Sequence, residues 1–265
     1  MYSSLQIAKK YLHYYLTASN GKGHGIHSPF VFDFIKNVLN DKKEKDCFIE
    51  IENIRRNLLK DPMLINVEDF GAGSAVIKSR QRVVKDIAAS SLKAKKYAQL
   101  LFRMVKYYQP QTIIELGTSF GISTAYMACG NKNALLYTCE GANEIAAIAA
   151  KNFQQLGINN IELIIGDFGA TLPGLIKKLS KVDFAFIDGN HRKAPTLSYF
   201  TTLLEVAAPD TILIFDDIHW SAEMEEAWEN IKKHPAVTMS IDLFFIGIIF
   251  FKKDFKVPQH FSIRF

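Results

Sequence analysis

The sequence predicts an α/β fold in which a mostly parallel sheet is covered by helices on both faces. From residue 111 onward, short apolar runs alternate with amphipathic helical segments, a pattern typical of parallel strands joined by crossover helices. Two further apolar runs, 237–243 and 245–251, leave no room for a helix between them, so they must pair as an antiparallel hairpin. The irregular helical pattern before residue 111 indicates an N-terminal helical subdomain.

Each element of this fold has its own signal in the sequence. Apolar runs predict parallel strands at residues 112–116, 135–139, 161–165, 183–187 and 211–215. The helices that follow them are expected to begin near Ile122, Asn143, Ala170, Pro195 and Ala222. Earlier helices are expected at residues 2–17, 28–39 (with Pro29 at a helix-start position) and 49–59, and in two pieces between about 80 and 108. We expect two domains: a helical subdomain with glycine-rich loops over residues 1–91 and an α/β domain over residues 92–265.

Length and composition allow one substantial core and argue against several classes of protein. The chain has 265 residues, of which 48% are hydrophobic, and a net charge of +5. Its basic residues form short pairs on helical faces rather than one stripe, so a nucleic-acid partner is not expected. The three cysteines lack metal-like spacing and an even count, which favours a reducing, cytoplasmic location. No signal peptide is visible, and the longest apolar run, 243–251, is too short to cross a bilayer, so no membrane partner is expected.

Acidic residues close three successive strands of the predicted sheet. Glu115 lies near the end of the first strand, Glu140 follows the second, and Asp167 follows the third. The carboxyl ends of parallel strands form the edge where α/β sheets bind ligands, so we expect these side chains to share one site. There Glu140 can accept hydrogen bonds from both hydroxyls of a ribose. Asp167 can accept from an adenine amine, with Phe168 offering an apolar face to the ring.

The turn after the first strand, from Gly117 to Gly121, is expected to hold the other end of this ligand. Gly117 lets the backbone approach closely, and the helix after Gly121 directs its N-terminal amides at a carboxylate. This layout resembles the S-adenosylmethionine (SAM) site of class I methyltransferases, whose fold is a Rossmann-like sheet of seven strands ending in a hairpin. The predicted cofactor-binding residues are therefore Glu115, Gly117, Thr118, Ser119, Gly121, Glu140, Asp167, Phe168 and Asp188.

A dinucleotide-binding interpretation of these glycines fits less well, and so does a second glycine-rich segment as the cofactor turn. A dinucleotide-binding fold has three close glycines around a pyrophosphate, whereas here a carboxylate precedes Gly117-x-x-x-Gly121 and would repel that anion. The same carboxylate suits the cationic sulfonium of SAM. A second segment, residues 69–74, also matches the pattern D-x-G-x-G, but no strand with a terminal acid follows it. A glycine-rich loop is expected there instead.

Three carboxylates follow the fourth and fifth strands. Asp188 opens the segment Asp188-Gly189-Asn190-His191, and Asp216-Asp217 closes the fifth strand. Like charges placed together need a shared proton or cation, and oxygen ligands suit Mg²⁺ better than zinc. The sequence therefore predicts a magnesium site at Asp188, Asp216 and Asp217, with Asp188 and His191 as catalytic residues. His191 is expected to remove a hydroxyl proton near neutral pH. Plainer roles stay open: Asp188 orienting SAM alone, Asp217 capping a helix, and His219 packing near Trp220.

The D-G-x-H and D-D motifs resemble those of the metal-dependent O-methyltransferases that modify macrolide sugars, and more distantly those of catechol O-methyltransferases. The resemblance covers residues 111–251. It implies SAM-dependent methylation of oxygen on a small hydroxylated acceptor with Mg²⁺ assistance. Catechol-type enzymes have Asp-Asn where this chain has Asp216-Asp217. A protein or nucleic-acid acceptor, or a SAM-binding module without turnover, are the alternatives, and a homodimer is compatible with the sequence.

Overall fold

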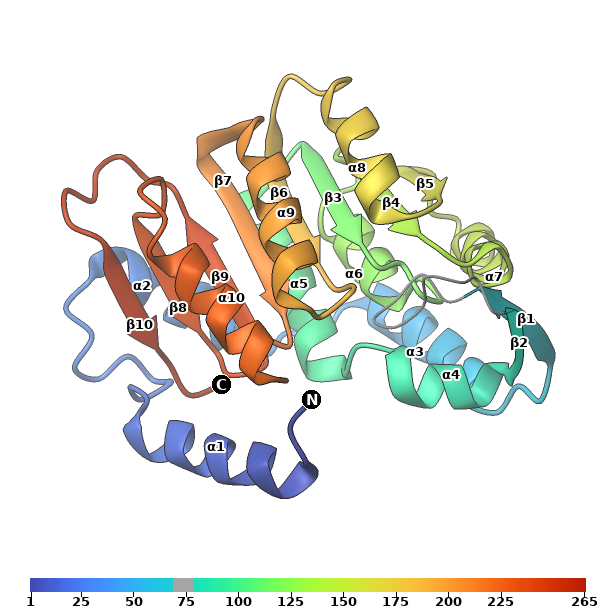
Figure 1. Ribbon diagram of the computed structural model, residues 1–265, viewed down its shortest axis with the longest axis horizontal. Helices are drawn as coiled ribbons and strands as arrows, with labels where there is room; N and C mark the ends of the chain where they lie inside the picture. The colour runs from blue at the N-terminus through green and yellow to red at the C-terminus, as the bar shows by residue number, and fades with distance from the viewer. Residues whose placement is uncertain (69–78) are drawn as a thin grey trace. The chain divides into compact units, whose positions relative to one another are not determined.

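The computed structural model describes residues 1–68 and 79–265 (Figure 1). These residues form two compact units: one comprises Met1–Asp41 and Leu172–Phe265, the other Lys42–Thr171. The units do not coincide with the predicted division between residues 91 and 92, which remains a prediction. The glycine-rich loop expected at residues 69–74 lies outside the described residues.

The first unit contains neighbouring strands in the order β10-β8-β9-β7-β6. Their bounds are Val182–Ile187 (β6), Ala207–Asp216 (β7), Met239–Asp242 (β8), Ile246–Phe250 (β9) and Gln259–Ser262 (β10). Strands β6 and β7 pair in parallel, whereas β9 runs antiparallel to both β7 and β8. This arrangement confirms the expected hairpin. The sequence did not predict β10, which pairs in parallel with β8, because its four residues include a single apolar side chain.

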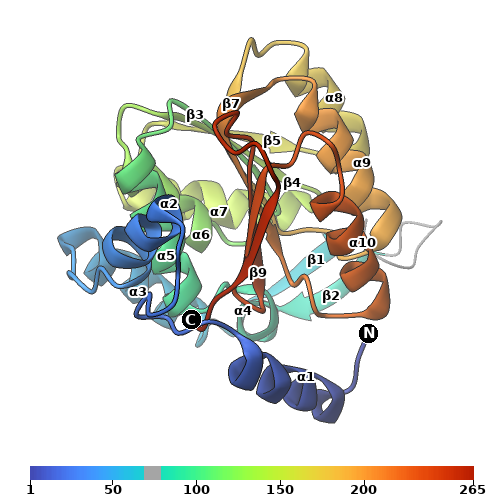
Figure 2. The ribbon, with the colours of Figure 1, turned by 90° about the vertical axis from the view of Figure 1, so that its left-hand side faces the viewer.

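Helices cover both faces of the sheet in the first unit. They are α1 (Ser4–Thr17), α2 (Pro29–Phe34) with its π-helical continuation η1 (Ile35–Leu39), α9 (Lys193–Leu204) and α10 (Ala222–Lys232). Figure 2 shows α9 and α10 on one face and α2 on the other. Trp228 of α10 lies so close to β9 that a Cβ atom at Gly247 would be 2.6 Å from its ring. On the opposite face, Phe30 of α2 packs edge-on against Phe250 at 5.0 Å.

The second unit shows the predicted alternation of parallel strands and helices. Its strands are Leu64–Glu68 (β1), Ser79–Val83 (β2), Thr112–Leu116 (β3), Leu135–Glu140 (β4) and Ile161–Ile165 (β5). Its helices are Asp46–Leu58 (α3), Val84–Ser91 (α4), Lys95–Tyr108 (α5), Ile122–Gly130 (α6) and Asn143–Gln155 (α7), while α8 (Phe168–Ile176) runs past the end of the unit. Strand β4 pairs in parallel with both β3 and β5. A buried cluster that includes Phe48, Phe102, Phe120 and Tyr126 forms the core around α3, α5 and α6.

The antiparallel pair β1 and β2 corrects the sequence prediction, which placed a helix from about residue 80. The helix α4 begins at Val84 instead. Ile65 and Val67 are buried while Asn66 between them is exposed, which is the alternation of a strand with one covered face. Asn66 also donates from its backbone N–H to the Glu144 carboxylate at 2.8 Å. The segment Leu64–Glu68 is too short for its alternation of buried and exposed residues to be recognised in the sequence.

The strands expected from the sequence are all present in these two units. Their parallel pairings and the β8–β9 hairpin confirm an α/β fold with a mostly parallel, Rossmann-like sheet and N-terminal helices. Within residues 1–68 and 79–265, no helix combines the length and apolar character needed to cross a membrane.

Candidate active site

The turn between β3 and α6 is built from residues that bring the backbone close to its neighbours. Gly117 and Gly121 have φ angles of 105° and 82°, which other residues adopt only with strain. Gly121 caps α6, and a Cβ atom there would lie 2.4 Å from the Phe153 ring. The N–H of Gly117 donates to the Cys139 carbonyl at 3.0 Å, which ties the turn to the end of β4. The predicted cofactor turn is therefore tightly held.

Glu115 is fully buried at the end of β3, and three hydroxyl groups donate to its carboxylate. It accepts hydrogen bonds from Ser123 Oγ at 2.6 Å, from Thr138 Oγ1 at 2.7 Å and from Thr124 Oγ1. These donors come from α6 and β4, so the carboxylate connects three elements around the turn. Its role as a cofactor contact remains a prediction, whereas its structural role follows directly from these bonds.

Glu140 at the end of β4 is held in a defined orientation beside the same turn. Its carboxylate accepts from the N–H groups of Ser119 at 2.8 Å and Ala142 at 3.0 Å. Burial raises the pKa of Glu140 above its ordinary value, and the backbone hydrogen bonds only partly offset that effect. A fixed carboxylate with remaining lone pairs can accept from two neighbouring hydroxyls, as the prediction of a ribose contact requires.

The other predicted cofactor residues also line the ends of β3 and β5. Thr118 is buried and its hydroxyl lies 2.6 Å from that of Thr138, while Ser119 has a positive φ of 48°. Asp167 is exposed and caps α8 by accepting from the Ala170 N–H at 3.2 Å. Phe168 beside it is half-buried. Since capping uses one carboxylate oxygen, the other stays available to the predicted adenine amine.

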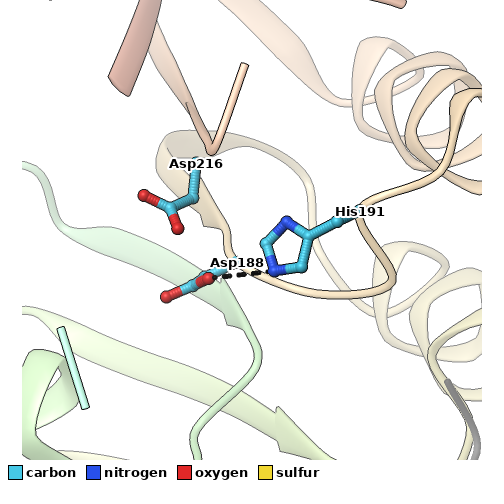
Figure 3. A group of neighbouring side chains, drawn as sticks. All are labelled: Asp188, His191 and Asp216. Atoms are coloured by element: carbon cyan, nitrogen blue, oxygen red, sulfur yellow. Dashed lines mark ion pairs between the residues drawn. The ribbon is translucent and has the colours of Figure 1, made fainter. Parts of the chain in front are cut away.

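The structure brings together three of the residues predicted for catalysis and metal binding. Asp188 follows β6, Asp216 ends β7, and His191 lies in the loop after Asp188 (Figure 3). One potential ligand atom from each lies within 4.8 Å of the other two. His191 Nε2 is 3.6 Å from Asp188 Oδ1, and Asp216 is only 2% exposed. Two carboxylates with an imidazole beside them fit a divalent cation, with the oxygens suited to Mg²⁺.

The loop that carries His191 adopts an uncommon backbone conformation. Asn190 and His191 have φ angles of 65° and 21°. Arg192 Nε donates to Asn190 Oδ1 at 3.1 Å, and Asn190 Nδ2 donates to the Tyr199 hydroxyl at 3.4 Å. Left-handed residues other than glycine are costly and concentrate at functional sites. In this loop the His191 ring lies toward Asp188 (Figure 3).

Asp217, the third predicted metal ligand, does not belong to this group of three. Its φ is 53°, and its N–H donates to the Phe245 carbonyl at 2.7 Å. The helix cap that was one alternative role for Asp217 is supplied by Ser221, whose Oγ accepts from the Met224 N–H at 3.2 Å. A ligand role for Asp217 remains a prediction.

Sequence reasoning missed the role of His219, which was expected at most to pack near Trp220. Its Nδ1 lies 3.0 Å from Glu225 Oε1 and its Nε2 lies 2.9 Å from Asp242 Oδ2. Burial lowers the pKa of His219, but the hydrogen bonds and charges of Asp242 and Glu225 outweigh it and raise the pKa above its ordinary value. The sequence carries no signal for the contacts of His219, because Asp242 lies 23 residues away at the end of β8.

Comparison with known proteins agrees with this fold. Residues 114–218 match a family described as a methyltransferase domain. The chain is 33% identical over 126 residues to a catechol O-methyltransferase of Niastella koreensis, covering 46% of this chain and 55% of that enzyme. The chain thus spans about half the length of the curated relative it matches.

Solved structures show the same fold at low sequence identity. An O-methyltransferase of Bacillus cereus in complex with S-adenosylhomocysteine (SAH) is 19% identical, with a TM-score of 0.56 over 80% of this chain and 93% of that one. The SAH-bound methyltransferase PaMTH1 of Podospora anserina is 15% identical, with a TM-score of 0.61 over 85% of this chain and 97% of that one. TomG of Streptomyces achromogenes, an O-methyltransferase in complex with SAM, is 20% identical, with a TM-score of 0.54 over 61% of this chain and 82% of that one.

The described residues therefore share the fold of solved methyltransferases that were crystallised with SAM or SAH. The segment from β3 to the turn after β7 matches a methyltransferase-domain family.

Proposed function

We propose that this protein transfers a methyl group from SAM to an oxygen of a small hydroxylated acceptor, with Mg²⁺ held by Asp188, Asp216 and Asp217. The observation that carries the proposal is the grouping of Asp188, His191 and Asp216 within 4.8 Å at the ends of β6 and β7. The similarity to a catechol O-methyltransferase, and the SAM or SAH bound in related folds, support the choice of donor and acceptor.

In this proposal each protein group has a defined task. His191 accepts the proton of the acceptor hydroxyl, and Asp188 at 3.6 Å stabilises the resulting imidazolium. The acceptor oxygen then forms a bond to the methyl carbon as the carbon–sulfur bond breaks, and SAH leaves as the second product. Mg²⁺ would lower the pKa of the hydroxyl and orient it. Asp216 would supply a carboxylate oxygen of the kind that such an ion takes.

The proposed cofactor contacts come from the turn after β3 and from the ends of β4 and β5. Glu140 binds the ribose hydroxyls, while Asp167 and Phe168 hold the adenine ring. Backbone amides at the start of α6 face the carboxylate of the methionine part, as helix N-termini favour anions. Glu115, which is also predicted to contact the cofactor, supports this turn through its three hydroxyl donors.

The test is a turnover assay with SAM and catechol in which SAH release is measured with Mg²⁺ and after treatment with EDTA. We expect turnover that EDTA abolishes and added Mg²⁺ restores. His191→Gln should lower kcat by roughly 10²- to 10⁴-fold, the usual effect of losing a general base. Asp216→Asn should abolish the response to Mg²⁺.

A control substitution on the same strand distinguishes the loss of a metal ligand from a general disturbance of β7. Asp210 is also a β7 carboxylate, but its side chain is 78% exposed, so Asp210→Asn should leave turnover unchanged. Turnover that is indifferent to EDTA and to Asp216→Asn would contradict the metal site. SAM binding by calorimetry without methylation of any hydroxylated acceptor would instead favour a binding module without turnover.

A further inference from the structure

A pocket of about 390 Å³ lies in the first unit, where α1 passes the carboxyl ends of β8 and β10. This volume is within the range of small-molecule sites in proteins. Helix α1 forms one wall, and Tyr14 fastens it there by donating its hydroxyl to the Ile263 carbonyl just after β10. The facing wall comprises His219, Asp242 and Phe244. None of these residues belongs to the group of Asp188, His191 and Asp216.

The acidic groups of this pocket are already matched by cations of the protein. Asp242 pairs with His219 Nε2 at 2.9 Å, and Glu225 accepts from both His219 Nδ1 at 3.0 Å and Lys10 Nζ at 2.9 Å. Because carboxylates hold both ring nitrogens, His219 cannot act as a general base and serves as a fixed cation. These four residues therefore form a closed network, the His219 cluster, whose carboxylates need no further cation.

Two further groups of α1 face the pocket without a carboxylate of their own. Lys9 and His13 both line it and are exposed, and within the described residues neither has an ion-pair partner. They lie four positions apart on α1, so they share one side of the helix. The pocket therefore has excess positive charge at its α1 wall, which favours an anionic ligand over a neutral or cationic one.

The aromatic part of the pocket wall is rigid. Phe244 is buried, adopts a positive φ of 70°, and stacks on the His219 ring at 5.1 Å. Tyr11 packs edge-on against it at 5.1 Å, and Tyr14 lies at 5.3 Å. These neighbours leave Phe244 only 2% exposed, so its ring is fixed and supplies a small rigid apolar patch to the pocket wall rather than an open face.

We propose that this pocket is a binding site for an organic anion, with its carboxylate or phosphate between Lys9 and His13 and its apolar body in the cavity beside Tyr14 and Phe244. The site is independent of the proposed methyl transfer, since its residues have no part in that reaction. Ser262, which also lines the pocket, supplies a hydroxyl group for an additional hydrogen bond, whereas the Thr17 hydroxyl already donates to the His13 carbonyl at 2.8 Å.

The experiment is isothermal titration of the full-length protein with 1-naphthoate, 1-naphthyl phosphate and, as the neutral analogue, 1-naphthamide. We expect at least one anion to bind at least 10-fold more tightly than the amide. Lys9→Gln and His13→Gln should each weaken anion binding by about 10-fold, as loss of a charge-assisted hydrogen bond does. The matched control Lys36→Gln removes one exposed charge from the same unit outside the pocket and should change affinity by less than about twofold.

Far-UV circular dichroism of each variant checks that the fold is intact, which is expected because Lys9 and His13 are exposed. Equal affinity for the anions and the amide, equal effects of Lys9→Gln and Lys36→Gln, or no binding at millimolar concentration would each overturn the proposal. Since no turnover is measured, none of these outcomes depends on whether the protein methylates a hydroxyl.

Discussion

Replacing Gly121 with alanine tests whether the turn before α6 depends on close approach as well as on a left-handed backbone. The φ of Gly121 is 82°, and a Cβ atom would lie 2.4 Å from the Phe153 ring. The left-handed conformation costs alanine about 1–2 kcal/mol. Overpacking a buried ring adds about 1–3 kcal/mol. Gly121→Ala should therefore lower the free energy of unfolding by about 2–5 kcal/mol.

Gly157 provides a matched control in the same unit. Its φ is 63°, but no atom lies within 4 Å of a Cβ atom placed there. Gly157→Ala should therefore show the backbone cost alone, about 1–2 kcal/mol. The difference between the losses of unfolding free energy in Gly121→Ala and Gly157→Ala gives the steric contribution of Phe153.

The assay is urea unfolding followed by far-UV circular dichroism, with wild type and both variants at the same pH. The double variant Gly121→Ala/Phe153→Leu should be less destabilised than the sum of the two single variants by about 1 kcal/mol or more, because the ring that causes the clash is gone. Equal destabilisation of the two alanine variants, within about 0.5 kcal/mol, would refute the argument.

Three further predictions address cofactor binding, pH dependence and helix capping. Glu140→Gln should weaken SAM binding by roughly 10- to 100-fold in calorimetry, because charge-assisted hydrogen bonds contribute about 1.5–3 kcal/mol; an unchanged affinity would remove Glu140 from the cofactor site. The pKa of His219 is raised in the folded protein, so its stabilisation is complete below its ordinary value of 6.5 and is lost as pH rises through the raised pKa. Urea unfolding at pH 6 and pH 9 should show this loss in wild type and not in His219→Gln, and the same slope in both proteins would contradict it. Ser221→Ala removes the cap of α10 and should cost about 1 kcal/mol in the same assay, with an effect near zero as the contrary result.

The sequence alone determined the strongly apolar strands of the sheet and the places where acidic residues end them. Apolar runs of five or six residues, such as β3 and β6, are recognisable because strands covered on both faces need hydrophobic residues throughout. Topology then places the carboxyl ends of parallel neighbours at one edge. This rule was enough to predict that Asp188 and Asp216 lie near each other.

Short or polar strands could not be predicted in the same way. Strand β10 is recognised only through its pairing with β8, since Gln259–Ser262 lacks a hydrophobic run. The pair β1–β2 relies on two buried side chains, Ile65 and Val67, which are too few to establish a period.

Tertiary structure alone decided what individual carboxylates and histidines do. The sequence predicts Glu115 as a cofactor contact, and the structure adds that hydroxyls from α6 and β4 donate to its carboxylate. The sequence suggests at most a packing role for His219, yet its two ring nitrogens form hydrogen bonds with Glu225 and Asp242. A local pattern specifies hydrophobic periodicity and strand ends. The partner of a polar side chain depends on which distant residues folding brings within about 3 Å, and chain spacing does not encode that distance.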